Sequence, residues 1–237
     1  MCGRYTNTAG PEELNDRFRV PIASDAGTRR FNIAPTEEVL AIVSPKGEPE
    51  ARLLRWGLVP SWADAIDGPL MINARMETVA TKPAYRRLIP RGERRALQLA
   101  DGYFEWLKPE KRGDRSKIGQ RQPFFFQVDG GVPFAFAAVW TPAKINGDWV
   151  HSVALLTCDS APNRVAAGIH DRMPVILADA DAQHAWLDSA LGAEEALALC
   201  GPLPAARLSA RPANPAVNKA GDLDAEGPDL LVAPQPA

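Results

Sequence analysis

The second residue of the chain, Cys2, has the most distinctive chemistry in the sequence. Loss of Met1 gives Cys2 a free α-amine and a thiol on neighbouring carbon atoms, a pair that no internal cysteine offers. An N-terminal amine has a pKa of about 7.7–8.0, so roughly a tenth or more is neutral at pH 7, whereas a thiol is only a few per cent ionised. This pair is typical of N-terminal nucleophile hydrolases and of condensation with an aldehyde. The alternative is a frayed N-terminus with an inert cysteine.

Two later segments contain the residue types that proton transfer requires. Alternation in Gly102-Tyr103-Phe104-Glu105-Trp106 predicts a strand with Tyr103 and Glu105 on one face. A carboxylate among aromatic side chains is costly to bury. Burial would raise the pKa of Glu105, which suits general acid–base catalysis. The alternative interpretation is a glutamate on an edge strand, exposed to water. Single histidines are more often structural than catalytic, but His170 is followed directly by Asp171 and Arg172, which adds some support for a proton-transfer role.

Tryptophan and arginine residues form a second candidate feature, suited to nucleic acid. Arg55 precedes Trp56, and Trp62 follows nearby; the rings suit stacking on bases and Arg55 suits a phosphate, although two core aromatics give the same pattern. Residues 72–95 have a net charge of about +5 within a chain of net charge −2. The cations of this basic segment are Arg75, Lys82, Arg86, Arg87, Arg91, Arg94 and Arg95. Such a surface is compatible with phosphate binding, and equally with a solvated helical face.

Length and composition indicate an ordinary globular protein. The 237 residues are 46% hydrophobic and 24% charged, which suits one large domain or two small ones. There is no apolar run of about 18 residues and no signal peptide pattern, so we expect a cytoplasmic, nucleoid-associated protein and no membrane partner. Cys2, Cys158 and Cys200 are too few and too widely spaced for a disulfide framework or a structural zinc site, so we expect no metal and no cofactor.

Hydrophobic periodicity and turn residues predict a chain of helices and strands. The expected helices are 11–19, 83–88, 181–190 and 193–199, with a helix or turn at 159–168. The expected strands are 38–44, 52–59, 96–107, 124–128, 134–140, 149–157 and 175–177, with an extended approach at 69–75. Residues 20–36 and 108–122 read as loops, the second of them mobile. We see no internal repeat or linker, so we expect one domain over residues 1–230 and a disordered tail over 231–237.

The candidate motifs occur in an order that is more specific than any one of them. They are Cys2-Gly3-Arg4, Asn32-Ile33-Ala34-Pro35-Thr36, Arg55-Trp56-Gly57-Leu58 with Pro60 and Trp62, Asn73-Ala74-Arg75 with Glu77, Gly102-Tyr103-Phe104-Glu105-Trp106, and His170-Asp171-Arg172-Met173-Pro174. This set resembles the SRAP family (SOS response-associated peptidase domain), whose members shield abasic sites in single-stranded DNA. With the strand pattern, the resemblance implies an α+β single domain with a curved, mostly antiparallel, barrel-like sheet and peripheral helices.

The resemblance also implies a reaction for Cys2. It implies that Met1 is removed autocatalytically, a self-processing peptidase activity, and that Cys2 then traps the ring-opened aldehyde of an abasic site. The amine forms a Schiff base and the thiol closes a thiazolidine, which leaves a stable DNA–protein crosslink. Asn73 matches the family residue that orients the amine, Glu105 the acid–base group, and His170 the group that assists sugar ring opening and crosslink reversal. A lyase-like or peptidase-like enzyme of DNA repair is therefore expected.

DNA contacts follow from the same comparison and from the basic segment. The expected partner is single-stranded DNA containing an abasic site, bound by a monomer with little sequence preference. Phosphate contacts are expected from positive side chains that position the strand. The candidate DNA-binding residues are Arg4, Asn32, Pro35, Arg55, Trp56, Trp62, Arg75, Arg86 and Arg87.

Three other functions remain open at this point. A glutamine amidotransferase of the N-terminal-nucleophile type also exposes Cys2-Gly3, although Arg4 is unusual there and the glycine-rich oxyanion motifs are missing. A cysteine peptidase acting in trans is suggested by Cys2, His170 and Asn73. A non-covalent single-stranded DNA-binding module with an inert Cys2 is the third alternative.

Overall fold

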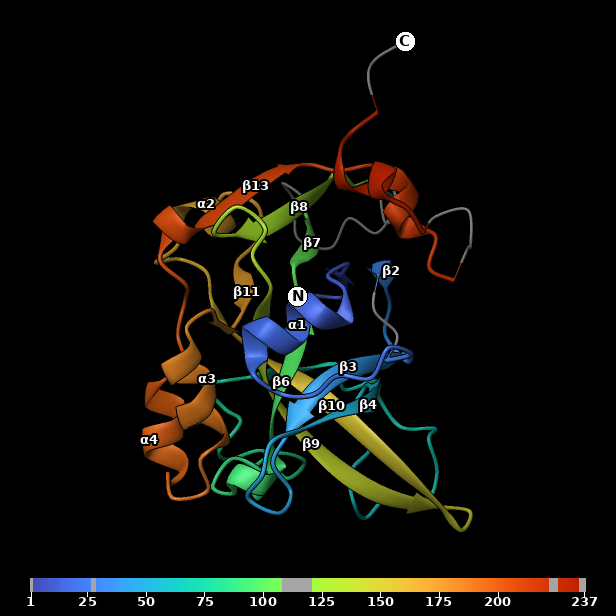
Figure 1. Cartoon of the computed structure of the whole chain (residues 1–237), viewed down its shortest axis with the longest axis vertical. Coiled ribbons are helices and arrows are strands. Elements are labelled where there is room, and N and C mark those ends of the chain that lie inside the picture. Colours follow the sequence, from blue (N-terminus) through green and yellow to red (C-terminus); the bar gives the residue numbers. More distant parts are fainter. Residues whose placement is uncertain (1, 27–28, 108–120, 222–225, 235–237) are drawn as a thin grey trace.

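Five strands close into a barrel at the centre of the fold (Figure 1). A computed structural model describes residues 2–26, 29–107, 121–221 and 226–234. Around the barrel the pairing order is β3, β4, β10, β9 and β6, and β6 returns to pair with β3. Their bounds are β3 (Glu38–Val43), β4 (Glu50–Trp56), β6 (Arg95–Ala100), β9 (Phe134–Ile145) and β10 (Asp148–Asp159). All of these pairings are antiparallel except β4 with β10.

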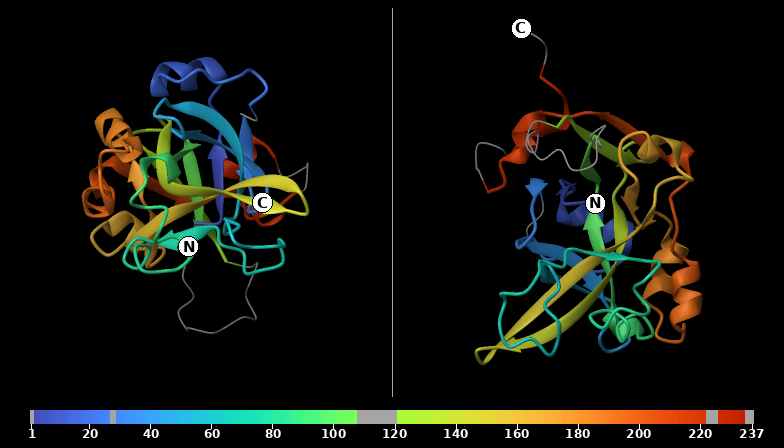
Figure 2. Two further views of the ribbon diagram at one scale, coloured as in Figure 1. Left: turned by 90° about the horizontal axis from the view of Figure 1, so that it is seen from below. Right: turned by 180° about the vertical axis from the view of Figure 1, so that it is seen from behind.

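Two of the barrel strands are almost completely buried. All but the first residue of β3 are buried, which gives it a continuous hydrophobic run rather than strict alternation. β6 is buried along its whole length, including the polar side chains of Arg95 and Gln98. The longest strands, β9 and β10, are joined at Asn146 and Gly147, which have φ of 52° and 97°. This is the turn that matches the twist of a hairpin, and the hairpin projects beyond the barrel (Figures 1 and 2).

A second sheet lies across one end of the barrel and contains the N-terminal strand (Figure 1). Its order is β13, β8, β7, β1 and β2, and every pairing is antiparallel. The bounds are β1 (Arg4–Asn7), β2 (Arg30–Ile33), β7 (Gly102–Trp106), β8 (Pro123–Val128) and β13 (Leu208–Pro212). The sequence did not predict β1 and β2, because a short polar strand such as Arg-Tyr-Thr-Asn has no periodic signal and is formed by its distant partners.

The strand predicted over residues 96–107 is two strands in two sheets. β6 ends at Ala100 in the barrel and β7 begins at Gly102 in the second sheet. A Cβ atom at Gly102 would lie 2.2 Å from the Phe125 ring, so only glycine allows β8 to pack this closely at the crossover. Asp101 between the two strands therefore joins the barrel to the sheet that contains β1.

The Asp101 carboxylate holds the end of β1. It accepts hydrogen bonds from the Thr6 and Thr8 hydroxyl groups and from the backbone N–H groups of Thr8 and Ala9. The Asp101 backbone N–H in turn donates to the Thr6 carbonyl at 3.0 Å. The carboxylate is buried, so these four donors compensate for its lost hydration.

Helices lie on the outside of the sheets (Figure 1). The α-helices are α1 (Pro11–Phe18), α2 (Arg164–Ala167), α3 (Ala180–Leu187) and α4 (Ala193–Ala198). The helices predicted near residues 11–19, 181–190 and 193–199 are therefore confirmed within a few residues. The predicted helix at 83–88 is wrong, since this segment consists of turns. Short 3-10 helices are η1 (Gly92–Arg94), η2 (Ala205–Arg207), η3 (Pro215–Asn218) and η5 (Pro228–Leu231).

The remaining strands are short. They are β5 (Asn73–Arg75), β11 (Arg172–Pro174) and β12 (Ile176–Leu177). β5 runs parallel to β10, and β11 pairs antiparallel with the end of β10. The mostly antiparallel, barrel-like α+β fold with peripheral helices is confirmed. In the described part of the chain, the helices are all too short or too polar to cross a bilayer.

The C-terminal segment covers the second sheet (Figure 2). The Arg211 side chain donates to the Leu231 carbonyl, and the Ala233 backbone N–H donates to the Pro212 carbonyl. Of the tail predicted to be disordered, residues 235–237 lie outside the described residues, as do residues 108–120 of the predicted mobile loop.

The Asp101→Ala substitution is expected to lower the free energy of unfolding by about 3 kcal/mol, because it leaves several buried donors without an acceptor. Chemical denaturation of the variant measures this loss. Asp148→Ala is the matched control, since Asp148 is an exposed carboxylate on the β9–β10 hairpin. Equal stability of the two variants would show that the Asp101 contacts contribute little.

Candidate active site

Cys2 is fully buried and lies directly before β1. The Asn73 side-chain amide donates a hydrogen bond to the Cys2 carbonyl at 2.9 Å. Asn73 comes from β5, whose position is set by parallel pairing with Leu155 of β10. The second sheet thus positions Cys2, the barrel strand β10 positions Asn73, and one hydrogen bond joins the two.

Glu105 and His170 form a carboxylate–imidazole pair beside Cys2. Glu105 is only 4% exposed, and its Oε1 lies 4.0 Å from His170 Nε2. Glu105 is also close enough to Cys2 to affect its thiol electrostatically. The strand register explains this placement, because Phe104 pairs with Arg4 and the next position along β7 therefore lies beside the residues that precede β1.

The His170 ring is oriented by its own loop. Its Nδ1 accepts a hydrogen bond from the Arg172 backbone N–H at 3.0 Å and lies 3.0 Å from Asp171 Oδ1. These two contacts at Nδ1 fix the orientation of the ring and leave Nε2 on the side of Glu105. The Ser160 hydroxyl donates to the His170 carbonyl at 2.6 Å, which fixes the backbone of this loop.

Burial and charge both act on the Cys2 thiol. Burial raises the pKa of the thiol well above its ordinary value, and the nearby Glu105 carboxylate raises it further, whereas the N-terminal amine of residue 1 and the Arg4 guanidinium oppose this shift. Cysteine nucleophiles that attack as thiolates require the opposite shift.

A bidentate ion pair that the sequence did not predict joins two of the motifs. Arg172 donates to both carboxylate oxygens of Glu77 at 2.6 and 2.9 Å, and also to the Thr157 carbonyl at 2.7 Å. The pair connects the chain that follows Asn73 to the loop that contains His170. Both residues belong to quoted motifs, but they are far apart in the sequence and nothing in their spacing indicates the contact.

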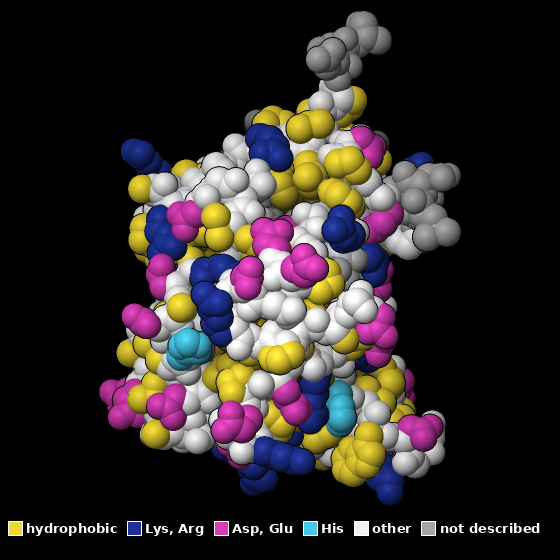
Figure 3. All heavy atoms as spheres, in the orientation of Figure 1, with side chains coloured by type: hydrophobic (Ala, Val, Ile, Leu, Met, Phe, Trp, Pro, Cys, Tyr) yellow, Lys and Arg dark blue, Asp and Glu magenta, His cyan; other side chains and the backbone are white. Residues whose placement is uncertain are grey.

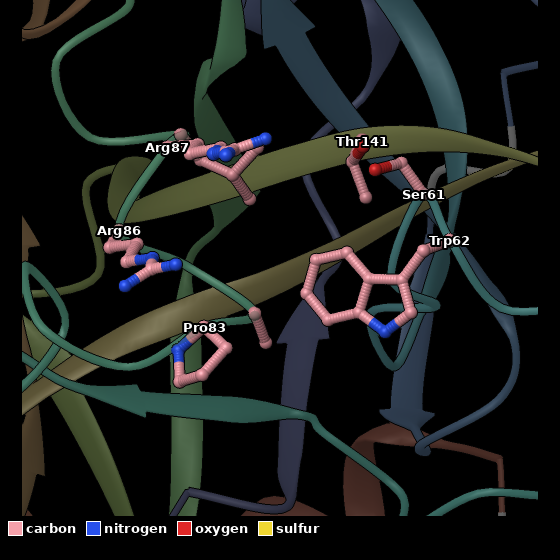
Figure 4. Close-up of a pocket in the computed structure, with 8 residues that line it drawn as sticks. Ser61, Trp62, Pro83, Arg86, Arg87 and Thr141 are labelled. Carbon is pink, nitrogen blue, oxygen red and sulfur yellow. The ribbon is translucent and has the colours of Figure 1, made fainter.

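Trp62 lies between three hollows beside the site, and its ring is 60% exposed. One hollow, of about 420 Å³, is also lined by Asn73 and Arg75. A second, of about 290 Å³, is lined by Arg86 and Arg87, which face the Trp62 side across the hollow (Figure 4). Together these hollows form a groove, the Trp62 groove, that leads from Asn73 to the basic segment.

A third hollow, of about 680 Å³, contains Arg55, Thr36 and the loop that follows Trp62. Gly57, which lines it, has a φ of 129°. A Cβ atom there would also lie 2.7 Å from the Leu70 side chain and 3.3 Å from Arg55 Nη1. Glycine at this position therefore allows the backbone to bend beside the Arg55 guanidinium.

The structure places three predicted DNA-contact residues away from the Trp62 groove. Trp56 is fully buried, and its indole N–H donates to the Ile72 carbonyl at 3.1 Å, so it is a core residue. Asn32 belongs to β2 rather than to a loop and is buried, with its side-chain amide directed to the Lys219 carbonyl. Pro35 is half-buried. Neither Asn32 nor Pro35 lines the three hollows at Trp62.

The predicted arginines occupy different environments. Arg75, Arg86 and Arg87 are exposed on the Trp62 groove. Arg4 is half-buried, and its Nη1 donates to the Gly3 carbonyl at 2.9 Å. Burial lowers the pKa of the Arg4 guanidinium, whereas Glu37 opposes this shift. Within the described ranges, no group of three or more His, Cys, Asp or Glu side chains is arranged to hold a metal ion.

Alkylation of the folded protein by iodoacetamide is expected to be slow at Cys2 at pH 7.5. A raised pKa leaves a smaller fraction of thiolate than in an ordinary cysteine, and burial limits access. Burial also raises the pKa of Cys158 and Cys200 to about 12. Mass spectrometry of each cysteine checks the rates, with the guanidinium-unfolded protein as control; a folded Cys2 that reacts like free cysteine contradicts the expectation.

Comparison with known proteins identifies the family. The family model described as SOS response associated peptidase (SRAP) matches residues 1–220. The abasic site processing protein YoaM of Bacillus subtilis is 34% identical over 192 residues, which cover 79% of each chain. The abasic site processing protein YedK of Escherichia coli is 31% identical over 238 residues, which cover 98% of this chain and 99% of YedK.

A solved structure supports the fold. A protein from Bacteroides thetaiotaomicron superposes with a TM-score of 0.83 at 19% identity, over 99% of this chain and 100% of that chain. At this identity the likeness concerns the fold alone. Because the family model covers nearly the whole chain, and because relatives above 30% identity match most of it, the chain belongs to the SRAP family.

Proposed function

We propose that this protein processes abasic sites in single-stranded DNA by forming a covalent crosslink through Cys2. The observation that carries the proposal is the convergence of Cys2 with the Asn73 amide and with the Glu105–His170 pair. The names of the relatives YoaM and YedK, both abasic site processing proteins, support the same substrate. The proposal requires that Met1 is removed, so that Cys2 has a free α-amine.

The proposed reaction begins with the sugar. An abasic deoxyribose is mostly a closed hemiacetal, and opening it moves a proton from the C1′ hydroxyl group to the ring oxygen, which releases the aldehyde at C1′. The Cys2 amine adds to this carbon, and loss of one water molecule gives a Schiff base. The thiol then adds to the same carbon and its proton passes to the nitrogen. The product is a five-membered thiazolidine, with one water molecule released overall.

Glu105 and His170 are suited to these proton transfers. A carboxylate–imidazole pair can donate one proton and accept another, as ring opening and loss of water both require. Their separation of 4.0 Å leaves them close enough to act on the same sugar. Efficient proton transfer needs such groups within hydrogen-bond reach of the reacting oxygen, and apo structures often have looser geometry.

Asn73 is suited to orienting the amine. Its side-chain nitrogen donates to the Cys2 carbonyl, while its Oδ1 is buried and has no hydrogen-bond partner among the described residues. In the proposed mature protein, the neutral Cys2 amine donates a hydrogen bond to Asn73 Oδ1. This hydrogen bond directs the lone pair of the amine nitrogen toward the aldehyde. The raised pKa of the Cys2 thiol supports the proposed order, in which the amine attacks first.

The Trp62 groove supplies contacts for a single strand. Arg75, Arg86 and Arg87 can hold phosphates, and the exposed Trp62 ring can stack on a base. Arg55 lines the neighbouring hollow and can hold a further phosphate. These contacts position a strand without reading its sequence, which suits a lesion that has no base.

Peptidase activity is proposed only for the removal of Met1, by the same buried group of residues. A buried thiol with a raised pKa counts against repeated turnover by a peptidase in trans or by an amidotransferase, whereas removal of Met1 is a single cleavage within the chain, where proximity replaces part of the activation. Glutaminase activity, or release of peptides from an unrelated protein, would favour those alternatives.

An oligonucleotide with one abasic site tests the proposed crosslink. Mature protein beginning at Cys2 is expected to form an adduct that survives heat and denaturant, because a thiazolidine is covalent. Denaturing gel electrophoresis and mass spectrometry measure the adduct and its mass. Cys2→Ala, and a tag placed before Cys2 that turns the amine into an amide, are both expected to abolish it. Absence of an adduct, or an unchanged adduct with Cys2→Ala, would refute the proposal.

Glu105→Gln is expected to slow crosslinking by about 100-fold, because a positioned acid–base group contributes on this order. Single-turnover rates measure the chemistry separately from binding, which the substitution should leave unchanged. Glu38→Gln is the matched control, since Glu38 is an exposed carboxylate at the start of β3. Equal rates for both variants would remove Glu105 from the mechanism.

A further inference from the structure

A second cluster of basic side chains, two arginines and a histidine, surrounds Trp140 on β9. Arg52 from β4 lies 5.6 Å from the Trp140 ring, and Arg94 from η1 lies 5.1 Å from it. The His151 ring from β10 contacts the edge of Trp140 at 5.8 Å between centroids. Cation–π and edge contacts with one buried ring thus bring three basic side chains together from three separate elements.

Two carboxylates near this cluster form ion pairs, one with an arginine outside the cluster and one with Arg52. Glu93 pairs with Arg91 at 2.7 Å, and Glu50 pairs with Arg52. Among the residues that the structure describes, Arg94 forms no ion pair, although the nearby Glu93 carboxylate acts on it electrostatically. Burial, Arg52 and Arg94 together lower the pKa of His151, which indicates a positive local potential that an anion would relieve.

The β9–β10 hairpin extends the cluster with an exposed aromatic ring. Trp149 is 65% exposed and lies two positions before His151, so both side chains are on the same face. Trp149 pairs across the hairpin with the exposed Lys144. Figure 3 shows hydrophobic, basic and histidine side chains gathered over this hairpin at the lower right. Alternating aromatic and basic side chains are typical of surfaces that bind a single strand.

The cluster is close to the Trp62 groove through β9 itself. Thr141 lines the hollow with Arg86 and Arg87, and Trp140 is the preceding residue, so the two side chains lie on opposite faces of β9. Beyond Val139, the edge of β9 that faces β6 is no longer paired with that strand. A DNA strand that leaves the hollow can therefore cross β9 at this edge, where the Arg94 guanidinium lies over the Trp140 ring.

We propose that Arg52, Arg94 and His151 form a second phosphate-binding site, which holds the backbone of the same DNA strand beyond the Trp62 groove. The proposal rests on the proposed binding of single-stranded DNA and deepens it, because it assigns a path to the strand away from Cys2. Trp149 supplies a stacking surface at the far end of this path. The site adds affinity for longer strands and takes no part in the reaction at Cys2.

The double variant Arg94→Gln/His151→Gln tests the second site. Binding is measured by fluorescence anisotropy with single-stranded DNA of two lengths. A strand of about 6 nucleotides fills one binding site only, whereas a strand of about 30 nucleotides extends beyond it. We expect the double variant to bind the long strand about tenfold more weakly, because losing one hydrogen bond to a charged group lowers affinity by about this factor. The slope of log affinity against log salt should fall by about 0.7 for each lost phosphate contact. Binding of the short strand should be unchanged.

Arg164→Gln is the matched control, because Arg164 is an exposed arginine of α2 and is not among the side chains that contact Trp140. It should bind both strands as the unmodified protein does, and thermal unfolding should verify that all variants are folded. Equal affinity of the double variant and the unmodified protein for the long strand overturns the proposal. So does an equal loss for short and long strands.

Two further measurements distinguish a second DNA-backbone site from a site for small anions and from the proposed reaction at Cys2. Inorganic phosphate that displaces the long strand no better than chloride at equal ionic strength supports a backbone site; selective displacement indicates a small-anion site and overturns the proposal. The double variant should form the Cys2 adduct with a short abasic strand at the normal rate. If the unmodified protein forms no adduct, the proposed function is wrong. The dependence of affinity on strand length then still shows whether the second phosphate-binding site exists.

Discussion

The position of β1 between β2 and β7 is the constraint on which the candidate site depends. A chain terminus is normally mobile, because few contacts offset its conformational entropy. Here the four residues of β1 pair with β7 on one side or β2 on the other, and Tyr5 pairs with both. The Asp101 carboxylate holds the end of the strand through four donors. Cys2 is therefore presented by a sheet rather than by a loose end, and its thiol and carbonyl have defined surroundings.

The two sheets contribute different parts of the site. The second sheet brings Cys2 and Glu105, while β10 of the barrel positions Asn73 through β5 and leads into the loop that contains His170. The crossover at Asp101 and Gly102 joins these two bodies of structure. Close packing at this crossover limits their relative motion, which is what a reaction with several proton transfers requires of its groups.

Burial and charge at Cys2 connect the structure to the proposed chemistry. Burial and a neighbouring carboxylate make the Cys2 thiol harder to ionise than an ordinary cysteine, because both raise its pKa. The same environment is compatible with an amine that reacts first, because a neutral amine needs orientation rather than ionisation. The Asn73 side-chain amide donates to the Cys2 carbonyl and so holds the Cys2 backbone in place. Arginine and tryptophan side chains then remain on the surface, where a nucleic acid strand can reach them.

The sequence by itself determined the fold class, most barrel strands and the residues that meet at the site. Long apolar runs such as β3, β9 and β10 give strong signals because they are buried whatever their partners are. Only the tertiary structure decided what depends on distant pairing: the polar strands β1 and β2, the break at Asp101, and the Glu77–Arg172 ion pair. Composition could not separate Trp56 from Trp62, because both are tryptophans in one motif. Their difference arises from the barrel, which encloses the first ring and leaves the second in the groove.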